Sequence, residues 1–256
     1  MKKIILRFVA LGCACVLAGL LYTQFKPYSF SYTLESEHFS FYYTKADKSS
    51  IDQIRDRLEE NYGRIVQDLA PPSMPKVKVR IYPNLADFHK EIDRKDAGNW
   101  LVGIAESNDE MRMVSPNDPE SGQSFESILK VAVHEFTHVV TFNLTAYPSP
   151  SVNWLYESIA CYEAGQFTDP KDVVHLSGGR YPTLAQLNSG SGNLNIYSVG
   201  YVMIEYIRDT WGMSAVRELI TSSGNLPAVL GKTAEEFEKG WQDYVQAKYL
   251  NPKKQS

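Results

Sequence analysis

Two histidines and a glutamate, His134, Glu135 and His138, lie in an apolar run that predicts a buried helix. Four residues make just over one helical turn, so both imidazoles share a face of this helix and can bind one Zn²⁺ together. Glu135 follows the first of these ligands, where its carboxylate can reach a metal-bound water and take its proton during attack on a carbonyl. The spacing therefore predicts hydrolytic zinc chemistry.

A catalytic zinc needs a third protein ligand and an open fourth position. Glu157 lies nineteen residues after His138, directly behind Trp154, Leu155 and Tyr156 in a second predicted helix. This arrangement resembles the gluzincin clan of HExxH…E zinc metallopeptidases, and more closely the small bacterial peptidase-MA-like family, which is related to the aminopeptidase-N/leukotriene-hydrolase branch. The resemblance implies that Glu157 is the third ligand of one Zn²⁺ per chain.

The resemblance also implies a hydrogen-bond donor for the negatively charged oxygen, or oxyanion, that forms during attack on the peptide carbonyl. In the aminopeptidase-like branch, a tyrosine in a Tyr-x-x-Gly setting hydrogen-bonds the tetrahedral intermediate. Tyr197 stands three residues before Gly200 in such a setting, and Tyr201 is the second choice. The family usually has Gly directly after the third ligand, whereas this chain has Ser158, whose hydroxymethyl group could narrow the pocket.

Two more acidic residues lie near these motifs. Aminopeptidases of this clan carry a Gly-x-Met-Glu-Asn motif whose glutamate holds the substrate amine. The segment 103–107 keeps the Gly and Glu106 but lacks the Met and Asn, so we interpret it mainly as a strand beside the substrate. Glu163 is expected to face solvent, with support of the metal site as the alternative.

The remaining histidines and cysteines show no ligand spacing. Cys161 is the one cysteine beyond the N-terminal segment, which rules out a disulfide framework there and predicts a small buried residue. The other histidines are expected to be surface or packing residues: His38, His89 and His175.

Hydrophobic periodicity predicts the elements that position these residues. Strands are expected at 39–44, 77–81, 100–105 and 111–114. Helices are expected at 50–69, 84–93, 124–143, 152–164, 195–211, 213–222 and 233–249, with one short helix near 182–187 inside a Gly- and Ser-rich loop at 178–195. This order predicts an α+β fold. The resemblance implies a zincin-like (thermolysin-type) fold, with a small mixed-sheet lobe at 27–145, a helical lobe at 146–256 and zinc in the cleft.

Composition limits the class of partner. The chain has 256 residues, 43% of them hydrophobic and 22% charged, which is typical of a globular protein. Four of the 26 basic residues precede residue 27 and no acidic residue precedes Glu35, so the rest has 22 basic and 30 acidic residues, a net charge of −8. An acidic body argues against nucleic-acid binding.

The first 26 residues form an apolar segment behind Lys2 and Lys3. Three fates are open: a retained membrane anchor, a cleaved signal peptide, or lipidation at Cys13 in a lipobox-like sequence. The flanking lysines favour a cytoplasmic N-terminus, so each fate places the remainder outside the cytoplasm.

The resulting hypothesis is an extracytoplasmic zinc metallopeptidase, membrane-anchored or secreted, that acts on a peptide or protein. Glu135 would be the general base and Tyr197 the oxyanion donor. An aminopeptidase and a non-catalytic envelope binding or assembly module that retains zinc stay open as alternatives.

Overall fold

Five strands form one mixed sheet in the order β1-β2-β3-β5-β4. β2 and β3 pair in parallel, as do β3 and β5, whereas β1 and β4 each pair antiparallel with their neighbour. The strands are β1 (Tyr32–Glu35), β2 (Phe39–Tyr43), β3 (Val77–Tyr82), β4 (Gly103–Ala105) and β5 (Glu110–Val114). β4 is therefore an edge strand.

One face of this sheet is apolar. Val77, Val79 and Ile81 are fully buried, while the intervening Lys78 and Arg80 are half-buried and form ion pairs with acidic residues at β5. Such alternation is typical of a strand with one covered face.

Helices cover the apolar face and fill the rest of the molecule. The helices are α2 (Ile51–Leu69), α3 (Leu85–Glu91), α4 (Phe125–Leu144), α5 (Asn153–Glu163), α6 (Val174–Ser177), α7 (Leu184–Ser189), α8 (Gly200–Trp211), α9 (Met213–Thr221), α10 (Leu226–Leu230) and α11 (Ala234–Val245). Short 3-10 helices lie at Lys45–Asp47, Pro119–Ser121, Pro150–Val152 and Ile196–Ser198, and a π-helical turn at Gln246–Leu250 follows α11.

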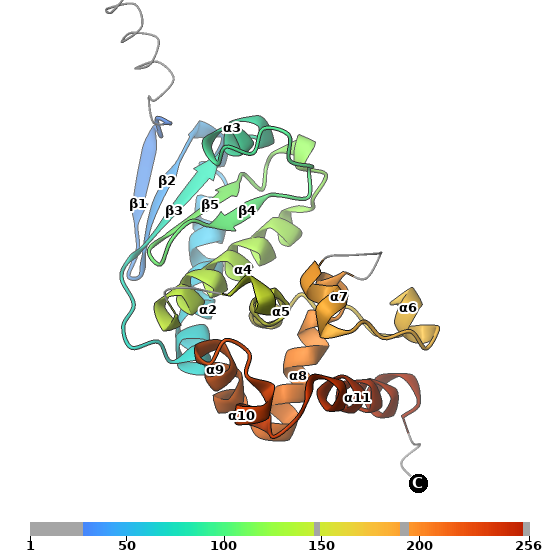
Figure 1. Ribbon diagram of the computed structural model, residues 1–256. Coiled ribbons are helices and arrows are strands. Elements are labelled where there is room, and N and C mark those ends of the chain that lie inside the picture. Colours follow the sequence, from blue (N-terminus) through green and yellow to red (C-terminus); the bar gives the residue numbers. More distant parts are fainter. Residues whose placement is uncertain (1–27, 146–148, 190–194, 253–256) are drawn as a thin grey trace, which may run out of the picture. The chain divides into compact units, whose positions relative to one another are not determined.

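The long helix α4 is the centre of the fold. It packs against α2, β4 and β5 on the sheet side and against α5 on the other, and Figure 1 shows it between the sheet and the C-terminal helices. α4 is apolar on most sides, as expected of a buried helix.

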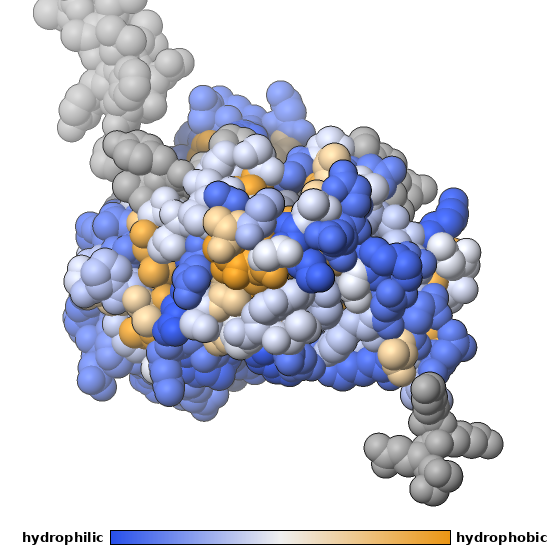
Figure 2. Space-filling view, turned by 60° about the horizontal axis from the view of Figure 1, so that its bottom comes forward, coloured by the Kyte–Doolittle hydropathy of each residue, from blue (hydrophilic) through white to orange (hydrophobic). Residues whose placement is uncertain are grey.

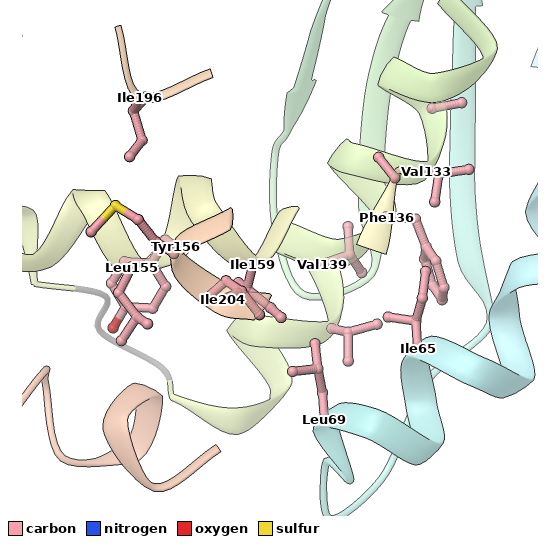
Figure 3. Packing of buried hydrophobic residues seen from close by; sticks show 14 of the residues in the cluster. Ile65, Leu69, Val133, Phe136, Val139, Leu155, Tyr156, Ile159, Ile196 and Ile204 are labelled. Atoms are coloured by element: carbon pink, nitrogen blue, oxygen red, sulfur yellow. The ribbon is translucent and has the colours of Figure 1, made fainter. Parts of the chain in front are cut away.

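Figure 3 shows how the core continues across these helices. Ile65 and Leu69 of α2 lie near Phe136 and Val139 of α4, and Ile159 of α5 lies near Ile204 of α8. The outer surface in Figure 2 is largely hydrophilic, with apolar atoms gathered near the middle of the face in view. A mixed α+β architecture with a small sheet and many helices is thus confirmed.

The main elements agree with the sequence-based expectations to within a few residues, with three differences. β4 starts at Gly103 rather than at residue 100, and the helix expected at 195–211 is a 3-10 turn followed by α8. Periodicity did not predict β1, α6 or α10, which have four, four and five residues.

The structure, a computed structural model, describes residues 28–145, 149–189 and 195–252. Residues 28–31 belong to a separate unit, and the fold above is that of the unit from Tyr32 onwards. The N-terminal segment at 1–26 lies outside the described residues. Within those residues, none of the helices has both the length and the apolar character needed to cross a bilayer.

Candidate metal centre

Three side chains from the adjacent helices α4 and α5 lie close together. His134 and His138 of α4 point their Nε2 atoms at each other across 3.1 Å. Glu157 of α5 lies opposite, with Oε2 3.3 Å from Nε2 of His134 and Oε1 3.8 Å from Nε2 of His138. These side chains are at most 16% exposed.

The spacing of these atoms fits a tetrahedral metal ion. Ligands at about 2.0–2.1 Å from a tetrahedral Zn²⁺ stand roughly 3.3 Å apart, and here the three residues can each offer one donor atom so that all three atoms lie within 4.8 Å of one another. The donor set of two imidazoles and one carboxylate is also one that zinc accepts. Oε2 of Glu157 is buried without a hydrogen-bond partner, so a cation among these residues would satisfy it.

Ionisation differs sharply between the two carboxylates of the site. Burial raises the pKa of Glu135 to about 7. The pKa of Glu157 falls to about 2 despite its burial, because the polar contact with His134 and the charges of both histidines stabilise the carboxylate. Two carboxyl groups with pKa values this far apart supply one permanent anion and one group able to exchange a proton near neutral pH.

The pKa values of the two histidines also differ from each other. Burial lowers the pKa of His138 to about 4, which favours a neutral ring. Burial also acts on His134, but polar contacts with Cys161 and Glu157 and the charge of Glu135 raise its pKa well above the usual value.

Glu135 projects towards β4 instead of joining the three ligands. Its carboxylate accepts a hydrogen bond from the backbone N–H of Ala105. Its side chain passes directly over Gly103, where an added Cβ would stand 2.9 Å from Cγ of Glu135. The edge strand and Glu135 are therefore in direct contact.

Tyr197 lies beside the ligands, although 46% of its surface is exposed. Its ring centroid is 5.9 Å from that of His134, and its hydroxyl hydrogen-bonds Glu157. Burial and the nearby Glu157 carboxylate raise the pKa of this phenol far above its usual value, so the group stays a donor. Tyr201 instead packs on Tyr162 and Phe167, so the structure brings Tyr197 alone of the two to the site.

Two adjoining cavities of about 540 and 500 Å³ meet at Glu135. Both are lined by Trp100, Gly103, His134 and Tyr197. The first continues along β4 towards Phe142, and the second towards Phe167. Trp100 is 70% exposed at the shared rim. Together the two cavities extend from Phe142 to Phe167, and Glu135 lines both of them.

Ser158 does not narrow this cleft, contrary to the concern raised by its position after the third ligand. Its side chain is fully buried and points at α8, where an added Cβ on Gly200 would stand 2.9 Å from Cα of Ser158. The extra atoms are accommodated because the glycine lies in the facing helix.

The expectation that Glu163 faces solvent is wrong. Its side chain is fully buried, and it accepts a hydrogen bond from Nη1 of Arg64 while its backbone carbonyl accepts one from Nη2. Burial raises its pKa to about 7. The partner comes from α2, far away in the sequence, and this pair ties α2 to α5.

Apart from Cys161, which lies beside His134, the other singled-out residues lie away from His134, His138 and Glu157. Glu106 pairs with Arg112 at 3.7 Å and lines neither cavity, so its placement gives no support to amine recognition. Cys161 is buried and unpaired, as expected. The remaining histidines make local contacts: His38 with Glu59, His89 with the Leu101 carbonyl and His175 with the Arg180 carbonyl.

Sequence analysis overlooked one residue at the site. Oε1 of Gln166 lies 2.9 Å from Nδ1 of His134, yet Gln166 belongs to no motif and carries no distinguishing signal in the sequence. Among known proteins, neither a family model nor a curated protein matches the chain. The geometry of the site must therefore carry the functional argument.

Proposed function

We propose that this protein is a zinc-dependent metallopeptidase of the gluzincin type that hydrolyses peptide bonds. The observation that carries the proposal is the convergence of His134, His138 and Glu157, which can each offer one donor atom within 4.8 Å of the others, with a second carboxylate, Glu135, beside them. A metal held for structure alone has no need of that carboxylate, so the arrangement favours catalysis over the binding-module alternative.

Each residue has a distinct role in this mechanism. His134, His138 and Glu157 would hold Zn²⁺, which, when bound, would polarise a carbonyl and make a water molecule more acidic. Glu135 takes a proton from the attacking water and delivers it to the leaving amine, which suits a carboxyl with a pKa of about 7. The Tyr197 hydroxyl turns from Glu157 to donate a hydrogen bond to the developing oxyanion.

The edge strand β4 supports a peptide as the substrate class. It borders the cavity at Glu135 and pairs with β5 on its other side. An extended peptide can add to such an edge through its own backbone groups, which places successive carbonyls along the cleft. Cavity on both sides of Glu135 favours cleavage within a chain.

A zincin-like fold and a site outside the cytoplasm complete the proposal. The mixed sheet, the α4 ligand helix and the helical remainder agree in order with that fold. The N-terminal segment at 1–26 would hold the enzyme at the membrane or direct its secretion, as its lysines and apolar run predict.

Digestion of a diverse peptide library by the full-length, zinc-loaded protein tests the proposal, with cleavage sites identified by mass spectrometry. Internal cuts are expected, and Glu135→Gln should lower kcat by about 10²- to 10⁴-fold while zinc remains bound. Trimming from free N-termini would point to an aminopeptidase instead. A folded, zinc-loaded protein that cuts nothing would overturn the proposal in favour of a binding module.

A further inference from the structure

The C-terminus of α5 ends in a tight cap that turns the chain back towards α4. Gly165 adopts the left-handed region with φ of 60°. Its N–H donates to the Tyr162 carbonyl at 3.1 Å, and the N–H of Gln166 donates to the Cys161 carbonyl at 2.9 Å. This pair of bonds defines the Schellman motif. Glycine suits the position because an L side chain is strained there.

This cap places the side chain of Gln166 against His134. Oε1 of Gln166 is 2.9 Å from Nδ1 of the imidazole, whereas Nε2 of the same ring faces His138 and Glu157. An amide oxygen only accepts hydrogen bonds, so Nδ1 must carry the hydrogen. In the neutral ring, the form that binds a metal, the lone pair is then left on Nε2, the atom that faces His138 and Glu157.

We propose that Gln166 is a positioning residue for the metal site, which holds His134 in the Nδ1–H tautomer and fixes the plane of its ring. This inference rests on the proposed zinc site. In the part of the chain that the structure describes, Nδ1 of His138 has no equivalent partner, so the outer support falls on one histidine. Because the amide is neutral, it orients the ring without adding negative charge to the site.

One helix therefore supplies both an inner ligand and an outer support. Glu157 projects from the body of α5, and Gln166 follows from its C-terminal cap. Outer hydrogen bonds of this kind typically change metal affinity by 10- to 100-fold.

The test compares zinc affinity, by competition with a chromophoric chelator, among full-length variants. Gln166→Met keeps the length of the side chain but removes the acceptor, and it is expected to raise the Kd for zinc about 10- to 100-fold. Gln166→Glu keeps an acceptor and should bind zinc at least as tightly as the wild type. Gln67→Met, on the exposed side of α2, is the matched control and should leave the Kd unchanged.

Thermal unfolding of the metal-free proteins separates positioning from folding. All three variants should unfold within a few degrees of the wild type, since the backbone of the cap stays intact. Equal zinc affinity in wild type and Gln166→Met would overturn the role of Gln166 and leave the proposed function standing. If the wild type itself binds no zinc, the proposed function fails as well.

Discussion

At the level of single residues, the absence of a side chain at Gly103 determines where the carboxylate of Glu135 can lie. An added Cβ would stand 2.8 Å from Cγ1 of Val131 and 2.9 Å from Cγ of Glu135, both on α4. Contacts below 3 Å are too close for carbon atoms, so something must move. Both neighbours line a cavity, and Glu135 has the longer and more flexible side chain, so it is the one we expect to be displaced.

Gly103→Ala is therefore expected to lower kcat by about 10- to 100-fold, because displacement of a catalytic group by about 1 Å costs roughly that much. The Kd for zinc should stay within about threefold of the wild type, since no ligand is touched. Steady-state kinetics on a peptide from the library and chelator competition measure the two effects. Full activity in this variant would show that Glu135 does not depend on the close approach of β4.

Gly63 provides the matched control. It lies in the exposed middle of α2, where no heavy atom comes within 4 Å of an added Cβ. Gly63→Ala should leave activity unchanged and raise stability by about 0.5–1 kcal/mol, the usual gain from alanine inside a helix.

Individual residues of the site were predictable to the extent that they share a helix turn or a family motif. His134, Glu135 and His138 follow from a spacing of one turn, and Glu157 from its place in the next helix. Contacts between residues that are distant in the sequence produce no such pattern. Arg64 and Glu163 are 99 residues apart, and Gln166 meets His134 across 32 residues.

Among the elements, the contact between α5 and α8 determines where Tyr197 stands. The two helices approach so closely at Gly200 that an added Cβ would lie 2.9 Å from Cα and 3.1 Å from Oγ of Ser158. Tyr197 lies one helical turn before this point, in the 3-10 helix Ile196–Ser198. The distance between the two helices thus sets the distance from the phenol to the metal ligands.

Gly200→Ala should force α8 away from α5 and destabilise the protein by about 1–3 kcal/mol. Ser158→Gly in the same chain removes the hydroxymethyl contact and should recover part of that loss, which urea unfolding of the double-mutant cycle measures. Strict additivity of the two changes would contradict the close packing of these residues.

Long elements were predictable and short ones were not, for a physical reason. α2 and α4 have 19 and 20 residues, enough turns for a periodic pattern to emerge. α10 has five residues between Asn225 and Gly231, and β1 has four with every second one exposed. Elements of this size are held by tertiary contacts more than by their own pattern.

On the scale of the whole molecule, the proposed metal ligands lie on the two helices on which the rest is built. α4 packs on the sheet and on α2, while α5 packs on α8 and α7. A metal bound by His134, His138 and Glu157 would therefore link the sheet side to the helical side. The acidic, hydrophilic exterior has no part in this linkage.

Removal of zinc is expected to lower the melting temperature of the protein. Free zinc at 1,000 times its Kd stabilises the folded state by about 4 kcal/mol, which corresponds to on the order of 10 °C for a domain of this size. Calorimetry with and without a chelator measures the shift. Glu157→Gln, which lacks the anionic ligand, should show little of it. An unchanged melting temperature in the wild type would argue against a metal at this site.

The cap on α5 has a consequence for insertions and grafts. Glu157 and Gln166 contact the same imidazole from one helix and its final turn. The length of the segment between them therefore fixes the positions of the two side chains relative to each other. One inserted residue would rotate everything beyond it by about 100° and advance it by about 1.5 Å, which takes the amide away from His134. Insertions or deletions beyond Gln166, in contrast, leave the relative positions of Glu157 and Gln166 unchanged. Transfer of this centre to another scaffold must therefore carry 157–166 as one uninterrupted piece.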